Sequence, residues 1–183
     1  FIMITDEVKR KVEMYFKNAC KTLNIEFSNY IYVYEPIGSR FATSCNSAEF
    51  SGNVLYINED WIKMAIDNDD EYDLEFVMAH EARHQYQQFV INDFYTRGRS
   101  CELPSIINSW IESFQVYKRN EGDELSEIAN ANQAVEIDAN AFAAAYMMIQ
   151  QNKGARIPPS CAEDVVKRMK EIAFKIWKAR FDD

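Results

Sequence analysis

The chain has 183 residues and a mass of 21.4 kDa, which is enough for one folded domain around a single hydrophobic core. Hydrophobic residues make up 48% of it and charged residues 27%, with only 5 Gly and 4 Pro, which excludes a disordered, fibrous or small disulfide-rich protein. Its 20 Lys and Arg against 29 Asp and Glu give a net charge of −9, which disfavours binding to nucleic acid. We expect a single domain over residues 1–183.

The cysteines and the apolar segments predict the compartment. The four cysteines are far apart in sequence and form no CxxC pair, which is typical of reduced thiols in the cytosol. The apolar opening from Phe1 to Ile4 is too short for a signal-peptide core, and no stretch reaches the roughly 18 apolar residues of a membrane span. We therefore expect a cytoplasmic protein without a membrane partner.

The first third of the chain is predicted to combine one helix with short strands. Apolar residues recur at helical spacing from Thr5 to Leu23, and Thr5 or Asp6 can cap this helix. β-branched and aromatic residues predict strands over 31–34 and 54–57, and the segment 41–44 is a candidate third strand. The acidic run over 67–73 lacks the mid-loop Gly of a calcium site, so we interpret it as a solvated loop leading into a helix.

The rest of the chain is predicted to be helical. Helices are expected over 61–66, 72–94, 104–118, 124–150 and 162–181, with breaks at 97–98, 121–122 and 154–159. The fold class is therefore α+β, with a small N-terminal sheet followed by a mostly helical body.

The strongest motif is HExxH, formed by His80-Glu81-Ala82-Arg83-His84 within a segment that is independently predicted to be helical. At about 3.6 residues per turn, His80 and His84 lie on one helix face and can reach the same metal ion, with Glu81 beside it. They are also the only two histidines in the chain. We expect them to project roughly opposite to one apolar stripe, formed by Leu74, Val77, Met78, Ala82, Tyr86 and Phe89.

A catalytic zinc site usually has three protein ligands and a water, so a third ligand is expected elsewhere. Because no histidine and no CxxC remain, a carboxylate is the best candidate. Glu136 lies on an Ala-rich predicted helix whose small residues allow close approach to the histidine helix. Its neighbour Asp138 is rotated from it by about 200°, so the two cannot both face the metal. The rival carboxylates are Glu102, Glu112, Glu127 and Asp138.

HExxH followed about fifty residues later by Glu-x-x-Ala-Asn-x-Phe-Ala, from Glu136 to Ala143, resembles the gluzincin class of zinc metallopeptidases. The resemblance is greatest to the small ImmA/IrrE-type peptidases of bacteria. It implies a zincin-like fold, one Zn²⁺ per chain held by His80, His84 and Glu136, and Glu81 as general base on a zinc-bound water.

The same resemblance assigns two further features. Asn140 stands where many gluzincins have an aspartate that orients a zinc-bound histidine, so it is expected to accept a hydrogen bond from one imidazole. The strand segment Val54, Leu55 and Tyr56, followed by Ile57-Asn58, is similar to the edge strand that holds substrate in such proteins. Arg83 stands where the family commonly has Gly.

Two functions from different classes follow from these motifs. The first is a zinc metallopeptidase that hydrolyses a protein or peptide substrate, and Glu81 favours it because a purely structural zinc site does not need this residue. The alternative is a non-catalytic zinc-binding regulatory or interaction protein that uses the zincin groove to bind a partner. For the enzyme, the group that stabilises the oxyanion is open: it must be a Tyr, Arg or Asn side chain or a backbone N–H, because both histidines bind the metal, and candidates include Arg97, Tyr117 and Tyr56.

Overall fold

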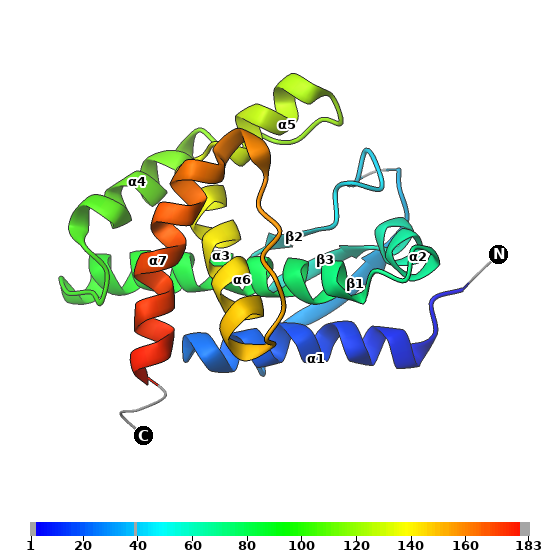
Figure 1. Ribbon diagram of the computed structural model, residues 1–183, viewed down its shortest axis with the longest axis horizontal. Coiled ribbons are helices and arrows are strands. Elements are labelled where there is room, and N and C mark those ends of the chain that lie inside the picture. The colour runs from blue at the N-terminus through cyan, green and yellow to red at the C-terminus, as the bar shows by residue number, and fades with distance from the viewer. Residues whose placement is uncertain (1–2, 39, 180–183) are drawn as a thin grey trace.

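The computed structural model describes residues 3–38 and 40–179 and has an α+β architecture in which helices dominate (Figure 1). Its strands are confined to the first third of the described chain, as the sequence predicts. The elements are α1 (Asp6–Leu23), β1 (Ile31–Glu35), β2 (Ala48–Ser51), β3 (Val54–Asn58), α2 (Glu59–Asp67), α3 (Glu71–Arg97), α4 (Pro104–Gln115), α5 (Glu124–Ala131), α6 (Ala134–Gln150), the short 3₁₀ helix η1 (Pro159–Cys161) and α7 (Ala162–Ala179).

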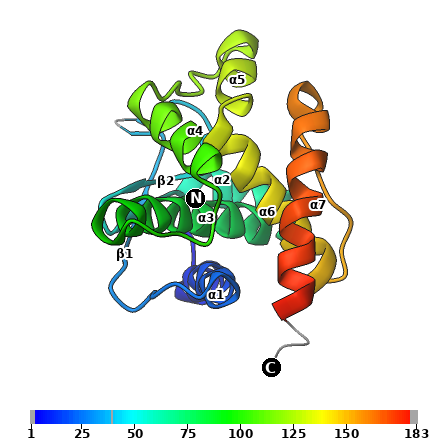
Figure 2. The same ribbon diagram turned by 90° about the vertical axis from the view of Figure 1, so that its left-hand side faces the viewer.

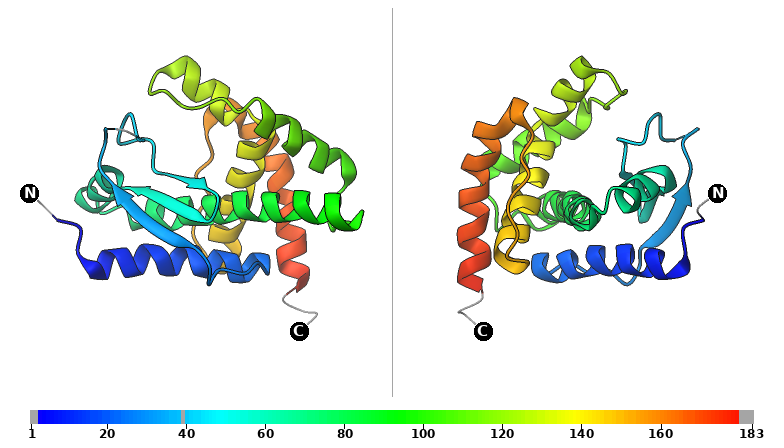
Figure 3. Two further views of the ribbon diagram at one scale, coloured as in Figure 1. Left: turned by 180° about the vertical axis from the view of Figure 1, so that it is seen from behind. Right: turned by 45° about the vertical axis from the view of Figure 1, so that its right-hand side comes forward.

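The sheet has three strands in the order β1-β3-β2, with β1 parallel to β3 and β2 antiparallel to it (Figure 3). A tight turn joins β2 to β3 at Gly52, whose φ of +60° is a left-handed conformation that favours glycine. Because β3 pairs on both sides, the expectation that Val54, Leu55 and Tyr56 form a substrate-holding edge is wrong. The edges of the sheet are β1 and β2.

The prediction of a possible third strand over 41–44 is also wrong, because this segment is a loop. The Phe41 side chain is buried there. The backbone N–H of Asn46 donates to the Thr43 carbonyl, and the backbone N–H of Thr43 donates to Oδ1 of Asn46, which closes a turn. Asn58, which ends β3, ties this loop down by donating from Nδ2 to the carbonyls of Thr43 and Asn46 at 3.0 and 2.9 Å. The strand that completes the sheet comes a few residues later, at Ala48–Ser51.

The largest hydrophobic core lies between α1, the sheet, α2 and the start of α3, and it continues onto α6 and α7. Thr5 caps α1 by accepting from the Val8 amide, and Asn24 ends it in a left-handed conformation. The fully buried ring of Phe16 on α1 packs against Tyr30 and Phe50, with centroids 5.1 and 5.6 Å apart. This packing fixes the sheet relative to α1.

Helix α3 is longer than predicted and is buried on more than one face. The acidic run leads into it as expected, because Asp70 accepts a hydrogen bond from the Asp73 amide as the N-cap, and Gly98 ends the helix with a φ of +66°. Leu74, Met78 and Ala82 are buried, but Phe89 is 55% exposed. The prediction of a single apolar stripe is therefore only partly correct. One side of α3 is covered by α1 and the sheet, and another side is covered by α6.

The predicted helix over 124–150 is two helices, α5 and α6, separated by Asn132 and Gln133. Gln133 has an extended backbone, and its side-chain amide accepts from the Lys118 amide and donates to the Lys118 and Asn130 carbonyls. No Pro or Gly marks this break. The interruption between α5 and α6 is therefore caused by the hydrogen bonds of Gln133 to the distant Lys118, and not by a residue of low helix propensity.

Helix α6 packs between α3 and α7 (Figure 2). Almost every residue from Val135 to Met147 is buried, and the alanines among them bring the neighbouring helices close. The final helix is described to Ala179, so the predicted residues 180–181 lie outside the described chain. Within the described residues, none of the helices combines the length and the apolar character needed to cross a membrane.

A buried cluster of four charged residues joins α3, α6, α7 and the segment before α4. Arg83 donates from Nε and Nη2 to Asp138 at 2.8 and 3.1 Å, and Arg168 on α7 donates from Nε to Asp138 at 2.7 Å. Glu102 accepts from Arg168 at 3.1 Å and lies 3.5 Å from Arg83. We call Arg83, Glu102, Asp138 and Arg168 the Arg83 ion cluster.

We expect Glu102→Gln to lower the free energy of unfolding at pH 7 by on the order of 3 kcal/mol, because it removes one charge from a buried ion cluster. Burial would raise the pKa of Glu102, but the charges of Arg83 and Arg168 outweigh burial and lower it. A lowered folded-state pKa adds stability above the unfolded value of about 4.3, and this stability is lost as the pH falls. Urea unfolding of the metal-free proteins should show a smaller difference at pH 3 than at pH 7. A difference that does not change with pH would contradict this expectation.

Candidate metal centre

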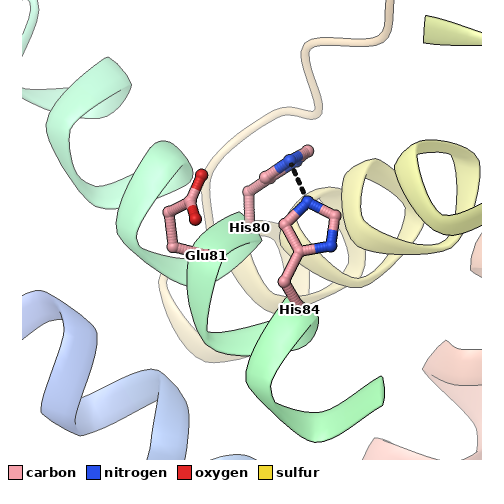
Figure 4. A group of neighbouring side chains, drawn as sticks. All are labelled: His80, Glu81 and His84. Atoms are coloured by element: carbon pink, nitrogen blue, oxygen red, sulfur yellow. Dashed lines mark hydrogen bonds between the residues drawn. The ribbon is translucent and has the colours of Figure 1, made fainter. Parts of the chain in front are cut away.

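Two imidazoles from one face of α3 meet at the floor of a cleft. The Nε2 atoms of His80 and His84 lie 3.0 Å apart, and both side chains are about 15% exposed (Figure 4). This is the arrangement that the HExxH spacing predicts, because residues four apart on a helix share a face.

Glu136 on α6 faces the same point as the two imidazoles. Its Oε2 atom lies 3.1 Å from Nε2 of His80, and its Oε1 atom lies 3.3 Å from Nε2 of His84. Ligand atoms at the usual distances from a tetrahedral zinc ion stand about 3.3 Å from one another. The separations among these three side chains therefore suit a single ion bound between them.

The electrostatics of this point favour a positive charge. Burial would lower the pKa of His84, but the charge and hydrogen bond of Glu136 outweigh burial and raise this pKa to about 9. Burial likewise opposes ionisation of Glu136, but the two histidines hold its pKa well below the usual value. A cation at this point satisfies a carboxylate and two imidazole nitrogens that are otherwise buried together.

The outer nitrogen of each imidazole is held by a side-chain amide. His80 Nδ1 lies 3.0 Å from Oδ1 of Asn140, which is the hydrogen bond expected for Asn140. His84 Nδ1 lies 2.9 Å from Oε1 of Gln87, a residue that the sequence analysis did not single out. Hydrogen bonding of Nδ1 to an oxygen puts the proton on Nδ1 and leaves Nε2 available to a metal.

Glu81 lies beside His80, His84 and Glu136 but outside the group of ligand atoms that are closest to one another. Its ligand atom and those of His80 and His84 all lie within 4.8 Å of one another, which is a wider spacing than that of Glu136. The side chain is 6% exposed, lines the cleft and makes no hydrogen bond to any part of the chain that the structure describes. Burial, against the attraction of His84 and His80, raises the pKa of Glu81 to about 7.

Tyr117, on the loop after α4, is the closest of the three open candidates for the oxyanion donor. Its hydroxyl donates to Oε1 of Glu136 at 2.7 Å and accepts from Nδ2 of Asn130 at 3.2 Å. Burial raises the pKa of the Tyr117 hydroxyl, so this group keeps its proton at neutral pH. Arg97 lies at the far end of α3 in an ion pair with Asp93, and Tyr56 packs under the Arg40 guanidinium, so neither reaches the histidines.

A cleft of about 1330 Å³ opens above these residues, between the β2 edge on one side and the segment from Phe114 to Ala131 on the other. The backbone N–H of Asn58 donates to the Ser47 carbonyl at 2.9 Å, so Ser47 and Asn58 form a hydrogen-bonded pair of the antiparallel ladder. Hydrogen-bonded and non-hydrogen-bonded pairs alternate along such a ladder, so the pairs that contain Ala48 and Phe50 are of the second kind. The backbone groups of Ala48 and Phe50 therefore point away from β3. Both residues line the cleft, so the unpaired edge of β2 faces it.

The rival carboxylates lie elsewhere. The Asp138 carboxylate bonds to Arg83, Arg168 and Gln87 and to neither histidine, and Glu102 belongs to the same ion cluster. Glu112 is exposed on α4, and Glu127 is exposed on α5 at the rim of the cleft. Of the predicted site residues, His80, Glu81, His84, Glu136 and Asn140 come together, and Val54, Leu55 and Tyr56 do not join them.

Comparison of the chain with models of protein families, with curated proteins and with solved structures finds no match. The functional conclusions therefore depend on the geometry and chemistry of the residues themselves.

Proposed function

We propose that this protein is a zinc-dependent metallopeptidase with a zincin-like arrangement of its site. The observation that supports it most is the convergence of His80, His84 and Glu136, whose ligand atoms are separated by 3.0 to 3.3 Å. Two imidazoles and one carboxylate with space for a water form the donor set of a catalytic zinc site. Zinc bound there supplies Lewis-acid activation of a water and of a scissile carbonyl.

Glu81 acts as the general base in this proposal. Its carboxylate has no hydrogen-bond partner among the described residues, so it is free to accept a proton from a water in the cleft. A pKa of about 7 allows the same group to take a proton and then pass it to the departing amine at neutral pH. This position favours an enzyme over a zinc-binding regulatory protein, because a structural metal site has no use for an unpartnered buried carboxylate.

Tyr117 acts as the electrophile that stabilises the oxyanion. A donor in this role must keep its proton and must lie next to the reacting carbonyl. The Tyr117 hydroxyl meets the first condition because burial raises its pKa, and its bond of 2.7 Å to Glu136 brings it to the edge of the ligand set.

The substrate in this proposal is a protein or peptide segment in extended conformation. The backbone groups of Ala48 and Phe50 on β2 face the cleft, so a peptide can pair with this edge by main-chain hydrogen bonds. The role that the sequence suggested for Val54, Leu55 and Tyr56 thus passes to the neighbouring strand.

We expect the purified protein to bind one zinc ion per chain and His84→Ala to bind far less, because the variant loses one of three ligands. Metal analysis after dialysis against a weak chelator measures this, with His84→Gln as a second variant that preserves side-chain volume. Equal metal content in wild type and both variants would refute the ligand assignment.

A further inference from the structure

The Gln87 side chain is completely buried on α3, three residues after His84. Its Oε1 atom lies 2.9 Å from Nδ1 of His84. A buried amide loses hydrogen bonds with water, and an apolar residue of similar size fills the same space without that cost. The presence of Gln87 therefore points to a role for its polar atoms.

The orientation of the Gln87 amide is fixed by two groups that can only accept hydrogen bonds. Its Nε2 atom donates to the Val135 carbonyl at 3.0 Å and to Oδ2 of Asp138 at 2.8 Å. Because both donor positions are used on that side, Oε1 must face His84 and must act as an acceptor. His84 Nδ1 must therefore carry the proton, and Nε2 points at Glu136 and His80.

Asp138 is itself held firmly in place. It is 2% exposed and receives charge-assisted hydrogen bonds from Arg83 and Arg168, at 2.7 to 3.1 Å. Those arginines belong to α3 and α7, whereas Asp138 and Val135 belong to α6. The position of Gln87 is thus determined by the packing of three helices, and not by α3 alone.

His80 has a simpler arrangement on the other side of the site. Its Nδ1 atom lies 3.0 Å from Asn140 on α6, and no further bond of the Asn140 amide is found within the described chain. The two histidines therefore differ in how firmly their outer nitrogens are held. This difference makes His80 an internal comparison for His84.

We propose that Gln87 is a positioning residue for the metal, and that it fixes the tautomer and ring orientation of His84 through the chain of hydrogen bonds Asp138–Gln87–His84. The proposal rests on the proposed zinc site. It assigns the Arg83 ion cluster a second task besides joining helices, because the cluster holds Asp138, and Asp138 holds Gln87.

The test uses the full chain labelled with ¹⁵N-histidine and loaded with zinc. Because the chain has only two histidines, the imidazole region of the spectrum contains at most two Nδ1–H signals. We expect both in the wild type, each protected from exchange with water. A wild-type spectrum without a protected Nδ1–H signal from His84 would contradict the proposal without any variant.

Gln87→Met keeps the volume of the side chain and removes both of its polar atoms. We expect the His84 signal to be lost or shifted while the His80 signal stays, and zinc affinity measured by chelator competition to fall about ten- to hundredfold. Asn140→Leu should affect the His80 signal instead. Gln115→Met, an equal change at an exposed position on α4, should alter neither signal nor affinity.

The outcomes separate this inference from the proposed function. If wild type and Gln87→Met bind zinc equally and show the same two signals, Gln87 has no positioning role although the zinc site stands. If the wild type binds no zinc, both the proposed function and this inference fail. If Gln87→Met loses affinity but retains an unchanged His84 signal, the effect is on stability, and the positioning role is refuted.

Discussion

Glu136→Ala is expected to weaken zinc binding by well over the roughly hundredfold loss that follows removal of a residue that only supports a ligand. The variant leaves two imidazoles to hold the ion, and it removes the negative charge that attracts a cation to this point. Loss of the Glu136 carboxylate also removes the acceptor of the Tyr117 hydroxyl at 2.7 Å. Competition with a chelator of known affinity measures the change.

Three variants serve as controls for Glu136→Ala. Asn140→Ala should bind zinc about ten- to hundredfold more weakly, because Asn140 only accepts a hydrogen bond from His80. Asp138→Asn should lose the same factor in zinc affinity or a smaller one, because Asp138 acts on His84 only through Gln87. Glu112→Ala, at an exposed glutamate on α4, should bind zinc like the wild type. A large loss in Asp138→Asn alone would overturn the ligand set.

Glu81→Gln is expected to reduce peptide hydrolysis by about 10²- to 10⁴-fold while zinc content and fold are retained. The amide has nearly the same shape as the carboxylate but cannot take a proton from water at neutral pH. Because Glu81 makes no hydrogen bond to the described part of the protein, its replacement breaks no contact that supports the fold. Zinc content and circular dichroism recorded on the same samples separate loss of chemistry from loss of structure.

Glu112→Gln is the matched control for this experiment, because it makes the same chemical change at an exposed site outside the cleft. It should cleave at the wild-type rate. A Glu81→Gln enzyme that cleaves nearly as fast as the wild type would refute Glu81 as the general base, even if the zinc site itself stands.

The position of the two histidines could be predicted from the sequence because it depends on one helix. Spacing along α3 places His80 and His84 on one face whatever lies around them. Glu136 could be proposed because the Ala-rich pattern of α6 allows close packing on α3, but only tertiary structure brings its oxygens to 3.1 and 3.3 Å from the two imidazoles.

Strand order could not be predicted in the same way. The apolar pattern of Val54 to Ile57 is that of a buried strand, and burial on both faces does not say whether a strand is central or at an edge. The position of β2 depends on the hairpin at Gly52, and the loop before β2 is held by hydrogen bonds from Asn58 to Thr43 and Asn46, which lie 15 and 12 positions away. The break at Gln133 is a further case, because its cause is a contact with Lys118.

Gln87 is the residue of the site that the sequence analysis missed. Its signal is weak, because residues three apart are neighbours on any helix face, and the sequence does not say whether that face is buried. The meaning of Gln87 depends on its burial and on Asp138, which comes from another helix. Arg83 is similar, since an arginine inside HExxH gives no hint in the sequence that its partner is Asp138.

The central claim is that this chain hydrolyses peptide bonds with a zinc site built from His80, His84 and Glu136. The most direct measurement incubates the zinc-loaded protein with a proteome-derived peptide mixture and identifies new termini by mass spectrometry, with Glu81→Gln treated in parallel. We predict new termini with the wild type that are absent from the Glu81→Gln sample and from wild type treated with a chelator. New termini that appear equally in all three samples, or in none of them, would contradict the account.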